Sequence, residues 1–310
     1  MNKEIRVFAP ATVANVACGF DILGFAIDQP GDEVRMRLMS DPGVRIVGIK
    51  GDGGRLPLDP ARNTVSVPVL ALLKKLKSSQ GFEIELHKKM PLGSGLGSSA
   101  ASAVAGVFAA NALLGNPLRR TELLEYALEG ERIACGSAHA DNVAPALLGG
   151  FALVRSYHPL DVVQIPTPDN LHCTILHPQI EIRTEDARKI LRKQIPFKDA
   201  VTQWGNIAGL IAGLMNSDYE LIRRSLQDVI IEPVRAILIP GFQEIKQAAI
   251  AAGALGCSIS GSGPSLFALS SSKETAEVVG RAMTPVMATL NIGSEVYISK
   301  INKVGPRILD

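Results

Sequence analysis

The sequence predicts an α+β protein with two domains. Short segments with the two-residue apolar period of strands alternate with longer segments whose apolar residues follow helical spacing. A chain of 310 residues can bury one large core or two ordinary ones. A proline-rich stretch over 157–170 interrupts the pattern near the middle of the chain. We therefore expect one domain over residues 1–160 and a second over residues 161–310.

The first half of the chain opens on a strand pattern and ends on one. Strands are predicted over 4–9, 33–39, 44–49, 82–87 and 150–155, and helices over 64–77, 100–114 and 121–134. Residues 40–43 have the composition of a hairpin turn between the second and third strands. Asn63 or Thr64 is expected to cap the first helix, and Ser98 or Ser99 the second.

The second half continues the alternation. Strands are predicted over 171–176 and 295–301, a strand–loop–strand unit over 257–268, and helices over 184–191, 199–215, 219–228, 242–252 and 274–290. The two helices between 199 and 228 are rich in Ala, Gly, Ile and Leu, so we expect them to pack against a sheet.

Composition is typical of a soluble cytoplasmic protein. The formal net charge is +2, and no basic run with interleaved aromatic residues occurs, so we expect no nucleic-acid partner. No signal peptide is recognisable, and no uninterrupted apolar stretch reaches the roughly 18 residues of a membrane span. The cysteines lack metal-ligand spacing and are expected to be reduced thiols: Cys18, Cys135, Cys173 and Cys257.

The most informative stretch follows the strand at 82–87. Three glycines at alternate positions can adopt backbone angles closed to other residues, so several N–H groups can face one side of a tight loop. The helix that follows adds the partial positive charge of its N-terminus. Such turns also serve simply to let a helix pack close to a sheet. The favoured interpretation is a phosphate site made by Pro91, Leu92, Gly93, Ser94, Gly95, Leu96, Gly97, Ser98, Ser99, Ala100 and Ala101.

Common phosphate-binding patterns do not match this stretch. GxxxxGK[ST] needs a lysine that is absent, and GxGxxG needs a glycine where Ser98 stands. No HRD or DFG triplet of protein kinases occurs. The segment instead resembles the PxGxGLGSSAA motif of the GHMP kinases, a superfamily of small-molecule kinases. That resemblance implies a loop wrapped around the phosphates of ATP. It also implies an N-terminal domain like ribosomal protein S5 domain 2 and a ferredoxin-like C-terminal domain.

A second segment bears on the substrate. Asn15 and Asp21 stand among small and apolar neighbours, with Gly19 permitting a turn between them. An isolated pair of this kind more often bonds its own backbone. The segment is, however, similar to the first motif of homoserine kinases, whose Asn and Asp bind the amino acid. It lacks the Lys or Arg followed by Gly-Glu-His that is typical of mevalonate kinase and galactokinase.

A third segment follows the helix that contains Glu131. Residues 139–150 read HADNVAPALLGG and resemble the homoserine-kinase run HPDNVAPALLGG, with Ala140 in place of proline. By that resemblance His139, Asp141 and Asn142 would face the substrate. Taken singly, such a Glu is usually solvated and such a His usually structural.

The same resemblance implies a magnesium site. Glu131 and a serine of the glycine loop would hold Mg²⁺, and Ser99 is preferred over Ser98 for that role. One carboxylate, one hydroxyl and phosphate oxygens suit an ion that prefers oxygen ligands and keeps several waters.

Two arginines complete the predicted substrate clamp. Thr184 to Arg188 resembles the family's ST-x-x-AR segment, and residues 232–235 resemble its EPxR. Arg188 and Arg235 would then bind the substrate carboxylate, which suits the planar guanidinium. For Arg235 a structural ion pair is the alternative. The segment 257–268 resembles the third superfamily motif, and that resemblance implies that Ser260 and Gly261 lie beside the substrate. Asn63 lies where the superfamily often contacts nucleotide, although a helix cap explains it equally well.

Together these segments imply an enzyme that transfers the γ-phosphoryl group of ATP to the side-chain hydroxyl of L-homoserine, a step of threonine biosynthesis. Ser99, Glu131, Asp141 and Asn142 would carry catalysis, and the use of a general base stays open. The alternatives are a GHMP kinase of another small alcohol, such as mevalonate or shikimate, and a non-catalytic metabolite sensor. A serine hydrolase is disfavoured because GxSxG is absent. Family membership also suggests a homodimer.

Overall fold

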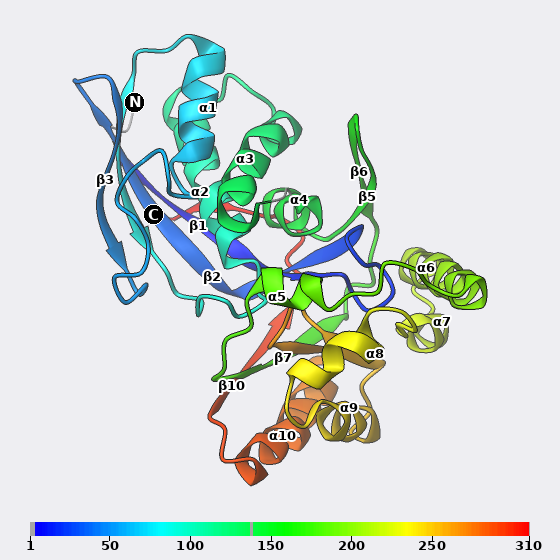
Figure 1. The fold of residues 1–310 in the computed structure, drawn as a ribbon. Helices are drawn as coiled ribbons and strands as arrows, with labels where there is room; N and C mark the ends of the chain where they lie inside the picture. The colour runs from blue at the N-terminus through cyan, green and yellow to red at the C-terminus, as the bar shows by residue number, and fades with distance from the viewer. Residues whose placement is uncertain (1–3, 137–138, 310) are drawn as a thin grey trace.

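The computed structural model describes residues 4–136 and 139–309, whose strands form two sheets (Figure 1). The first sheet has the order β11-β1-β2-β4-β3, and a β5–β6 hairpin pairs with β2. Its strands are β1 (Glu4–Ala14), β2 (Leu23–Met39), β3 (Gly43–Lys50), β4 (Gly81–His87), β5 (Phe151–Tyr157), β6 (Leu160–Ile165) and β11 (Arg307–Leu309). The second sheet has the order β10-β7-β9-β8, with β7 (His172–Pro178), β8 (Gly256–Ile259), β9 (Leu266–Ser270) and β10 (Ser294–Lys300).

Helices cover one face of each sheet (Figure 1). On the first sheet, α2 and α4 pack against β1 and β2, and α1 and α3 pack against α2. These are α1 (Val67–Leu76), α2 (Ser98–Leu113), α3 (Leu124–Cys135) and α4 (Ala140–Leu148), with a short 3₁₀ turn at Arg120–Leu123. On the second sheet lie α9 (Phe242–Ala251) and α10 (Lys273–Thr289).

The remaining helices lie between or beside the two layers (Figure 1). They are α5 (Thr184–Lys189), α6 (Phe197–Asn216), α7 (Tyr219–Ser225) and α8 (Glu232–Arg235), followed by a 3₁₀ turn at Ala236–Leu238. The two sheets share a core at Phe25 of β2. Its ring stacks on Phe151 at 4.6 Å between centroids and meets Phe267 of β9 edge-on at 5.9 Å. This aromatic contact helps to stabilise the packing of the two sheets against each other.

The α+β prediction is confirmed, and most predicted elements are present within a few residues of their expected bounds. The predicted hairpin between the second and third strands is wrong. β4 lies between β2 and β3, pairing antiparallel with β2 and parallel with β3. The turn at 40–43 connects β2 to β3, but the two strands do not pair with each other. Local composition predicts a turn, but it does not say which strand will lie next to β2 in the sheet.

Three strand segments were missed. β2 begins at Leu23, ten residues before the predicted start of this strand. It continues through Gln29-Pro30-Gly31, whose composition is typical of a strand end. Gly31 is needed there because a Cβ would lie 2.3 Å from the ring of Phe8. β6 and β11 were also missed. The division at residue 160 stays a prediction, and in the sheets both β6 and β11 belong with the first half of the chain.

Two helix predictions need correction. Ser66 precedes α1, and Gly97 precedes α2, so none of the four predicted capping residues occupies the N-cap position. The Ser98 and Ser99 side chains form hydrogen bonds with carboxylates instead. α6 packs on α7 beside the layers and makes little contact with a sheet.

Candidate active site

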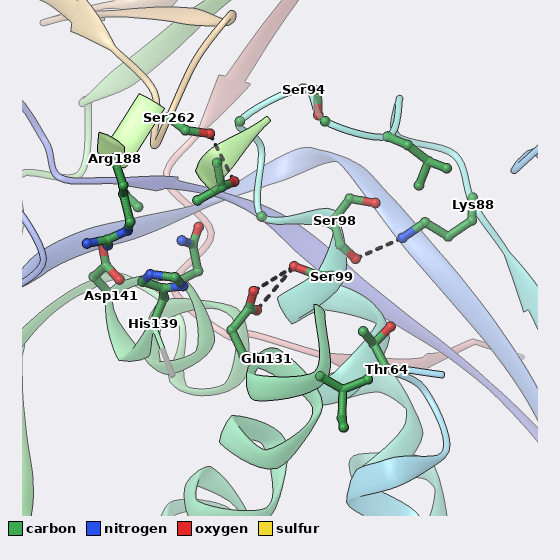
Figure 2. Close-up of a pocket in the computed structure, with 18 of the residues that line it drawn as sticks. Thr64, Lys88, Ser94, Ser98, Ser99, Glu131, His139, Asp141, Arg188 and Ser262 are labelled. Atoms are coloured by element: carbon green, nitrogen blue, oxygen red, sulfur yellow. Dashed lines mark hydrogen bonds between the residues drawn. The ribbon is translucent and has the colours of Figure 1, made fainter. Parts of the chain in front are cut away.

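A cavity of about 390 Å³ opens between the glycine loop, the α3–α4 region, α5 and α8. Figure 2 shows Ser99 and Glu131 near its middle, Lys88 and Ser98 on one side, and Arg188, Asp141 and His139 on the other. Most predicted site residues line it: Asn15, Asp21, Asn63, Leu92, Gly93, Ser94, Gly95, Gly97, Ser98, Ser99, Glu131, His139, Asp141, Asn142, Arg188 and Arg235. Segments far apart in the sequence thus meet in one place.

The glycine loop has the left-handed backbone conformation that its sequence indicates. Gly93, Gly95 and Gly97 have φ of +68°, +76° and +65°, in the left-handed region. At Gly97 a Cβ would lie 2.0 Å from Thr12 Oγ1, and at Gly95 it would lie 2.4 Å from the carbonyl oxygen of Ser260. Only glycine fits at these two positions. The loop leads directly into the N-terminus of α2, which begins at Ser98.

The two serines at the start of α2 have separate partners. The Ser99 hydroxyl donates to Glu131 Oε1 at 2.8 Å, which places a hydroxyl and a carboxylate side by side on the cavity wall. The Ser98 hydroxyl donates to Asp32 Oδ2 at 2.9 Å. Of the two serines, Ser99 is therefore the one beside Glu131.

A buried ion pair beneath the loop was missed by the sequence analysis. Lys88 pairs with Asp32, and both side chains are almost fully buried. Lys88 Nζ also donates to the Ser98 carbonyl and the Ser102 hydroxyl, each at 2.8 Å. Asp32 Oδ1 accepts the backbone N–H of Lys89 at 2.9 Å. This network joins β2, the segment before the loop and the first turn of α2.

A second ion pair lies at the opposite end of the cavity. Arg188 donates two hydrogen bonds to Asp21, with Nη2 to Oδ1 at 2.6 Å and Nη1 to Oδ2 at 3.1 Å. Phe20 lies beneath both arginines, with guanidinium carbons 5.4 Å (Arg188) and 5.1 Å (Arg235) from its ring centroid. Cationic groups thus gather at this end.

Arg235 is held by backbone carbonyls. Its Nε donates to Ala187 at 3.1 Å and its Nη1 to Gly261 at 3.0 Å. Among the described residues, no carboxylate lies within ion-pair distance of it. Burial, with the charge of Arg188 adding to it, lowers the pKa of Arg235 to about 10. The predicted alternative of a structural ion pair is therefore not found in the described part of the chain.

Asp21 is fixed by a left-handed turn. Residues 15–17 and Asp21 itself have positive φ. Asn15 Oδ1 accepts the N–H of Asp21 at 3.0 Å, and Asn15 Nδ2 donates to the Gly261 carbonyl at 2.8 Å. The Tyr157 hydroxyl donates to the Asp21 carbonyl at 2.8 Å. The Asn15 side chain thus forms hydrogen bonds with backbone groups, as is usual for an isolated Asn/Asp pair. It also lines the cavity.

The start of α4 brings three polar residues to the cavity. Asn142 Oδ1 accepts the Thr12 hydroxyl at 2.8 Å, which leaves Nδ2 as the donor of that amide. Burial raises the pKa of Asp141 to about 7, and the charge of Asp21 acts in the same direction. Burial lowers the pKa of His139, and Arg188 adds to this effect.

Some predicted site residues lie behind the cavity wall. Leu96, Ala100 and Ala101 are fully buried in the core, and Pro91 does not line the cavity. Ser260 donates to the Gly95 carbonyl at 2.8 Å and so braces the glycine loop, as Gly261 braces Asn15 and Arg235. Asn63 does line the cavity, yet its side chain is engaged by the Pro57 carbonyl and the Val65 N–H.

Comparisons with known proteins agree with this geometry. A family model for the GHMP kinases N terminal domain matches residues 63–150, and one for the GHMP kinases C terminal matches residues 210–288. A homoserine kinase of Chlorobium phaeobacteroides is 56% identical, and the match covers 99% of this chain and 100% of that protein. The chain belongs to the homoserine kinase family.

Solved structures agree with the family assignment. A crystal structure of homoserine kinase from Cytophaga hutchinsonii has a TM-score of 0.98 and 62% identity, covering 100% of this chain and 98% of that one. Mevalonate kinase from L. major shares the fold alone, with a TM-score of 0.70 at 17% identity. The predicted GHMP-kinase fold and phosphotransferase class are confirmed, and members of the homoserine kinase family use ATP as phosphate donor.

Sequence reasoning missed several cavity residues. Thr12, Lys88, Thr184 and Ser262 touch the site or line it. The Thr184 hydroxyl lies 3.3 Å from that of Ser262, across from the glycine loop. A signal existed for Lys88, which stands just before the glycine loop, but its partner Asp32 is 56 residues away.

Proposed function

We propose that this chain transfers the γ-phosphoryl group of ATP to the side-chain hydroxyl of L-homoserine. One observation carries the proposal. A single cavity joins a glycine loop at a helix N-terminus to a cluster with paired acidic and basic side chains. The glycine loop suits phosphates, and the charged cluster suits an amino acid, which carries an ammonium group and a carboxylate. Relatives named homoserine kinase match over nearly the full chain.

The loop end would bind the nucleotide phosphates. Its backbone N–H groups and the N-terminus of α2 stabilise negative charge at fixed positions, so no reorganisation is needed as charge develops. Asn63 and the lining residues Leu56 and Thr64 continue the wall beyond the loop. We propose that the nucleoside of ATP binds against this part of the wall.

The Ser99 and Glu131 oxygens fit a magnesium ion. They are hard oxygen donors 2.8 Å apart, and phosphates and waters would supply the remaining ligands. No cluster of three or more His, Cys, Asp or Glu side chains suited to a metal occurs among the described residues. That agrees with an ion bound largely through substrate. When bound, Mg²⁺ would neutralise charge on the phosphates.

The charged end would hold the amino acid. Arg188 and Arg235 would bind its carboxylate, and Asp21 with Asp141 its ammonium group. Asn142, whose amide is oriented by Thr12, would donate to the substrate hydroxyl. His139, kept neutral by burial, would add a polar contact without adding positive charge. The chemistry then consists mainly of positioning the hydroxyl in line with the transferred phosphoryl group.

A coupled ADP-release assay across candidate alcohols tests this proposal. We expect kcat/KM for L-homoserine to exceed that for mevalonate, shikimate and galactose by roughly a thousandfold, because a site built for two charges rejects compounds that leave them unpaired. A preference for another alcohol would contradict the substrate. ADP release with none of them would favour the non-catalytic alternative.

We also propose cytoplasmic location, a homodimer and the two-domain division. The described cysteines are free and buried, and burial raises the pKa of Cys18 and Cys257 to about 12. No helix within the described ranges has the length and apolar character to span a membrane. Light scattering of the purified chain tests the dimer.

A further inference from the structure

The substrate end of the cavity is occupied by an ion pair that the protein makes with itself. Asp21 and Arg188 share two hydrogen bonds, and each side chain is 33% exposed. These are the side chains proposed to bind the two charges of homoserine. In the free protein each is therefore already paired.

Two buried atoms beside this pair have no hydrogen-bond partner within the described part of the chain. They are Arg188 Nε and Asp141 Oδ1. Buried polar groups are usually paired, and leaving one unpaired costs free energy. One atom is a donor, and the other is an acceptor when Asp141 is ionised. Together they match a ligand that brings both a carboxylate and an ammonium group.

The two partners of the ion pair are held in the structure in different ways. The backbone of Asp21 is held on both sides, by Asn15 at its N–H and by Tyr157 at its carbonyl. Arg188 projects on a long side chain from α5, a helix of six residues. Separation of the pair is thus expected to occur by movement of the arginine, while the carboxylate stays in place.

We infer that ligands bind by exchanging with this ion pair, so that the site selects molecules carrying both charges. The inference rests on the proposed function. The ligand carboxylate takes Arg188 together with Arg235, and the ligand ammonium takes Asp21 together with Asp141. A zwitterion leaves the net charge of the cavity unchanged and every ion paired.

A ligand with one charge breaks the same pair and leaves one protein ion without a partner. 4-Hydroxybutyrate, which lacks the ammonium group, would leave Asp21 unpaired. 3-Aminopropan-1-ol, which lacks the carboxylate, would leave Arg188 unpaired. Once a bound ligand shields this partly exposed pair from water, leaving one of its ions without a partner costs more than the pair itself contributes. Each charge should therefore help only when the other is present.

The wild-type protein provides the first test. Phosphorylated product is measured by phosphorus NMR for homoserine, 4-hydroxybutyrate, 3-aminopropan-1-ol and propan-1-ol, and kcat/KM is taken from the slope at low concentration. We expect both singly charged alcohols to stay within about threefold of propan-1-ol, with homoserine far above all three. Independent factors for the two charges, whose product gives the homoserine value, would overturn the inference.

Two variants provide the second test. Asp21→Asn frees Arg188, so kcat/KM for 4-hydroxybutyrate should rise about tenfold or more above wild type while that for homoserine falls. Arg188→Gln should do the same for 3-aminopropan-1-ol. Arg183→Gln, an exposed arginine just before α5, is the matched control and should change neither. Circular dichroism verifies that each variant is folded.

The outcomes separate this inference from the proposed function. Failure of the wild-type protein to phosphorylate homoserine would contradict the proposed function itself. Phosphorylation of homoserine with additive charge effects, and no gain in either variant, would contradict the exchange alone.

Discussion

Glu131 and Ser99 lie side by side on the cavity wall, where we propose that phosphates and magnesium bind. Glu131 is 3% exposed, and its carboxylate accepts the serine hydroxyl. Glu131→Gln keeps the volume and removes the charge, so we expect kcat to fall on the order of a hundredfold. The unfolding temperature should move by no more than about 2 °C. Steady-state kinetics and thermal unfolding measure both. Glu129→Gln, on the same helix, is the control, and equal activities for the two variants would refute the role of Glu131.

Arg235 tests the substrate half. Arg235→Ala removes a buried guanidinium that backbone carbonyls hold at the cavity. Loss of a charged contact costs about 1–3 kcal/mol, so KM for homoserine should rise roughly tenfold to a hundredfold, while KM for ATP should change less than about twofold. Initial-rate kinetics with each substrate varied provide the comparison, with exposed Arg224→Ala as control. A parallel rise in both KM values would place Arg235 outside the substrate half.

Asp141 links binding to pH. Its pKa is raised to about 7, so the carboxylate is mostly protonated at pH 6 and mostly ionised at pH 8. Because only the ionised form attracts an ammonium group, KM for homoserine should fall as pH rises through about 7. Asp141→Asn should have a higher KM with little change over that range. A flat profile in the wild-type protein would show that Asp141 does not bind the ammonium group.

Sequence motifs predicted the residues that line the cavity better than those that hold them in place. Ser99, Glu131 and Arg188 lie within recognisable segments, and all three line one cavity. Asp32 carries no local signal, since it sits inside a strand and its role depends on Lys88, 56 residues further along. Contacts of this range are decided by packing, which a local pattern does not describe.

At the scale of elements, α2 depends on the Asp32–Lys88 pair beneath its first turn. Lys88→Met leaves a fully buried carboxylate without a counter-charge, so we expect a loss of about 3–5 kcal/mol in the free energy of unfolding. KM for ATP should also rise, because the Ser98 carbonyl and the glycine loop lose their anchor.

Combining Lys88→Met with Asp32→Asn should recover most of that stability, since no buried charge remains unpaired. Denaturant titrations of the single and double variants measure the recovery. If the double variant is no more stable than Lys88→Met, the ion pair does not explain the loss.

For the strands, sequence periodicity predicted positions along the chain but not neighbours in the sheet. Periodicity located β3 and β4 to within two residues, yet it could not say that β4 would lie between β2 and β3. The early part of β2 was missed because its Pro and Gly are breakers in isolation. In the sheet, Gly31 pairs with Pro10 and leaves room for Phe8.

At the scale of the whole molecule, the site depends on the two halves meeting. The glycine loop belongs to the first half of the chain, while α5 and α8 come from the second (Figure 1). Ser260 and Gly261 bond directly to Gly95 and Asn15 across this junction. The two-domain division stays a prediction, and the sequence pattern does not indicate that β11 returns to pair with β1.

A crystal structure with L-homoserine and a non-hydrolysable ATP analogue tests the two-part cavity most directly. We predict the phosphates at Gly93–Ser99 and the homoserine carboxylate on Arg188 and Arg235, with the Asp21–Arg188 hydrogen bonds broken and the hydroxyl facing the γ-phosphate. Homoserine bound away from these arginines, or phosphates bound away from the glycine loop, would contradict the account.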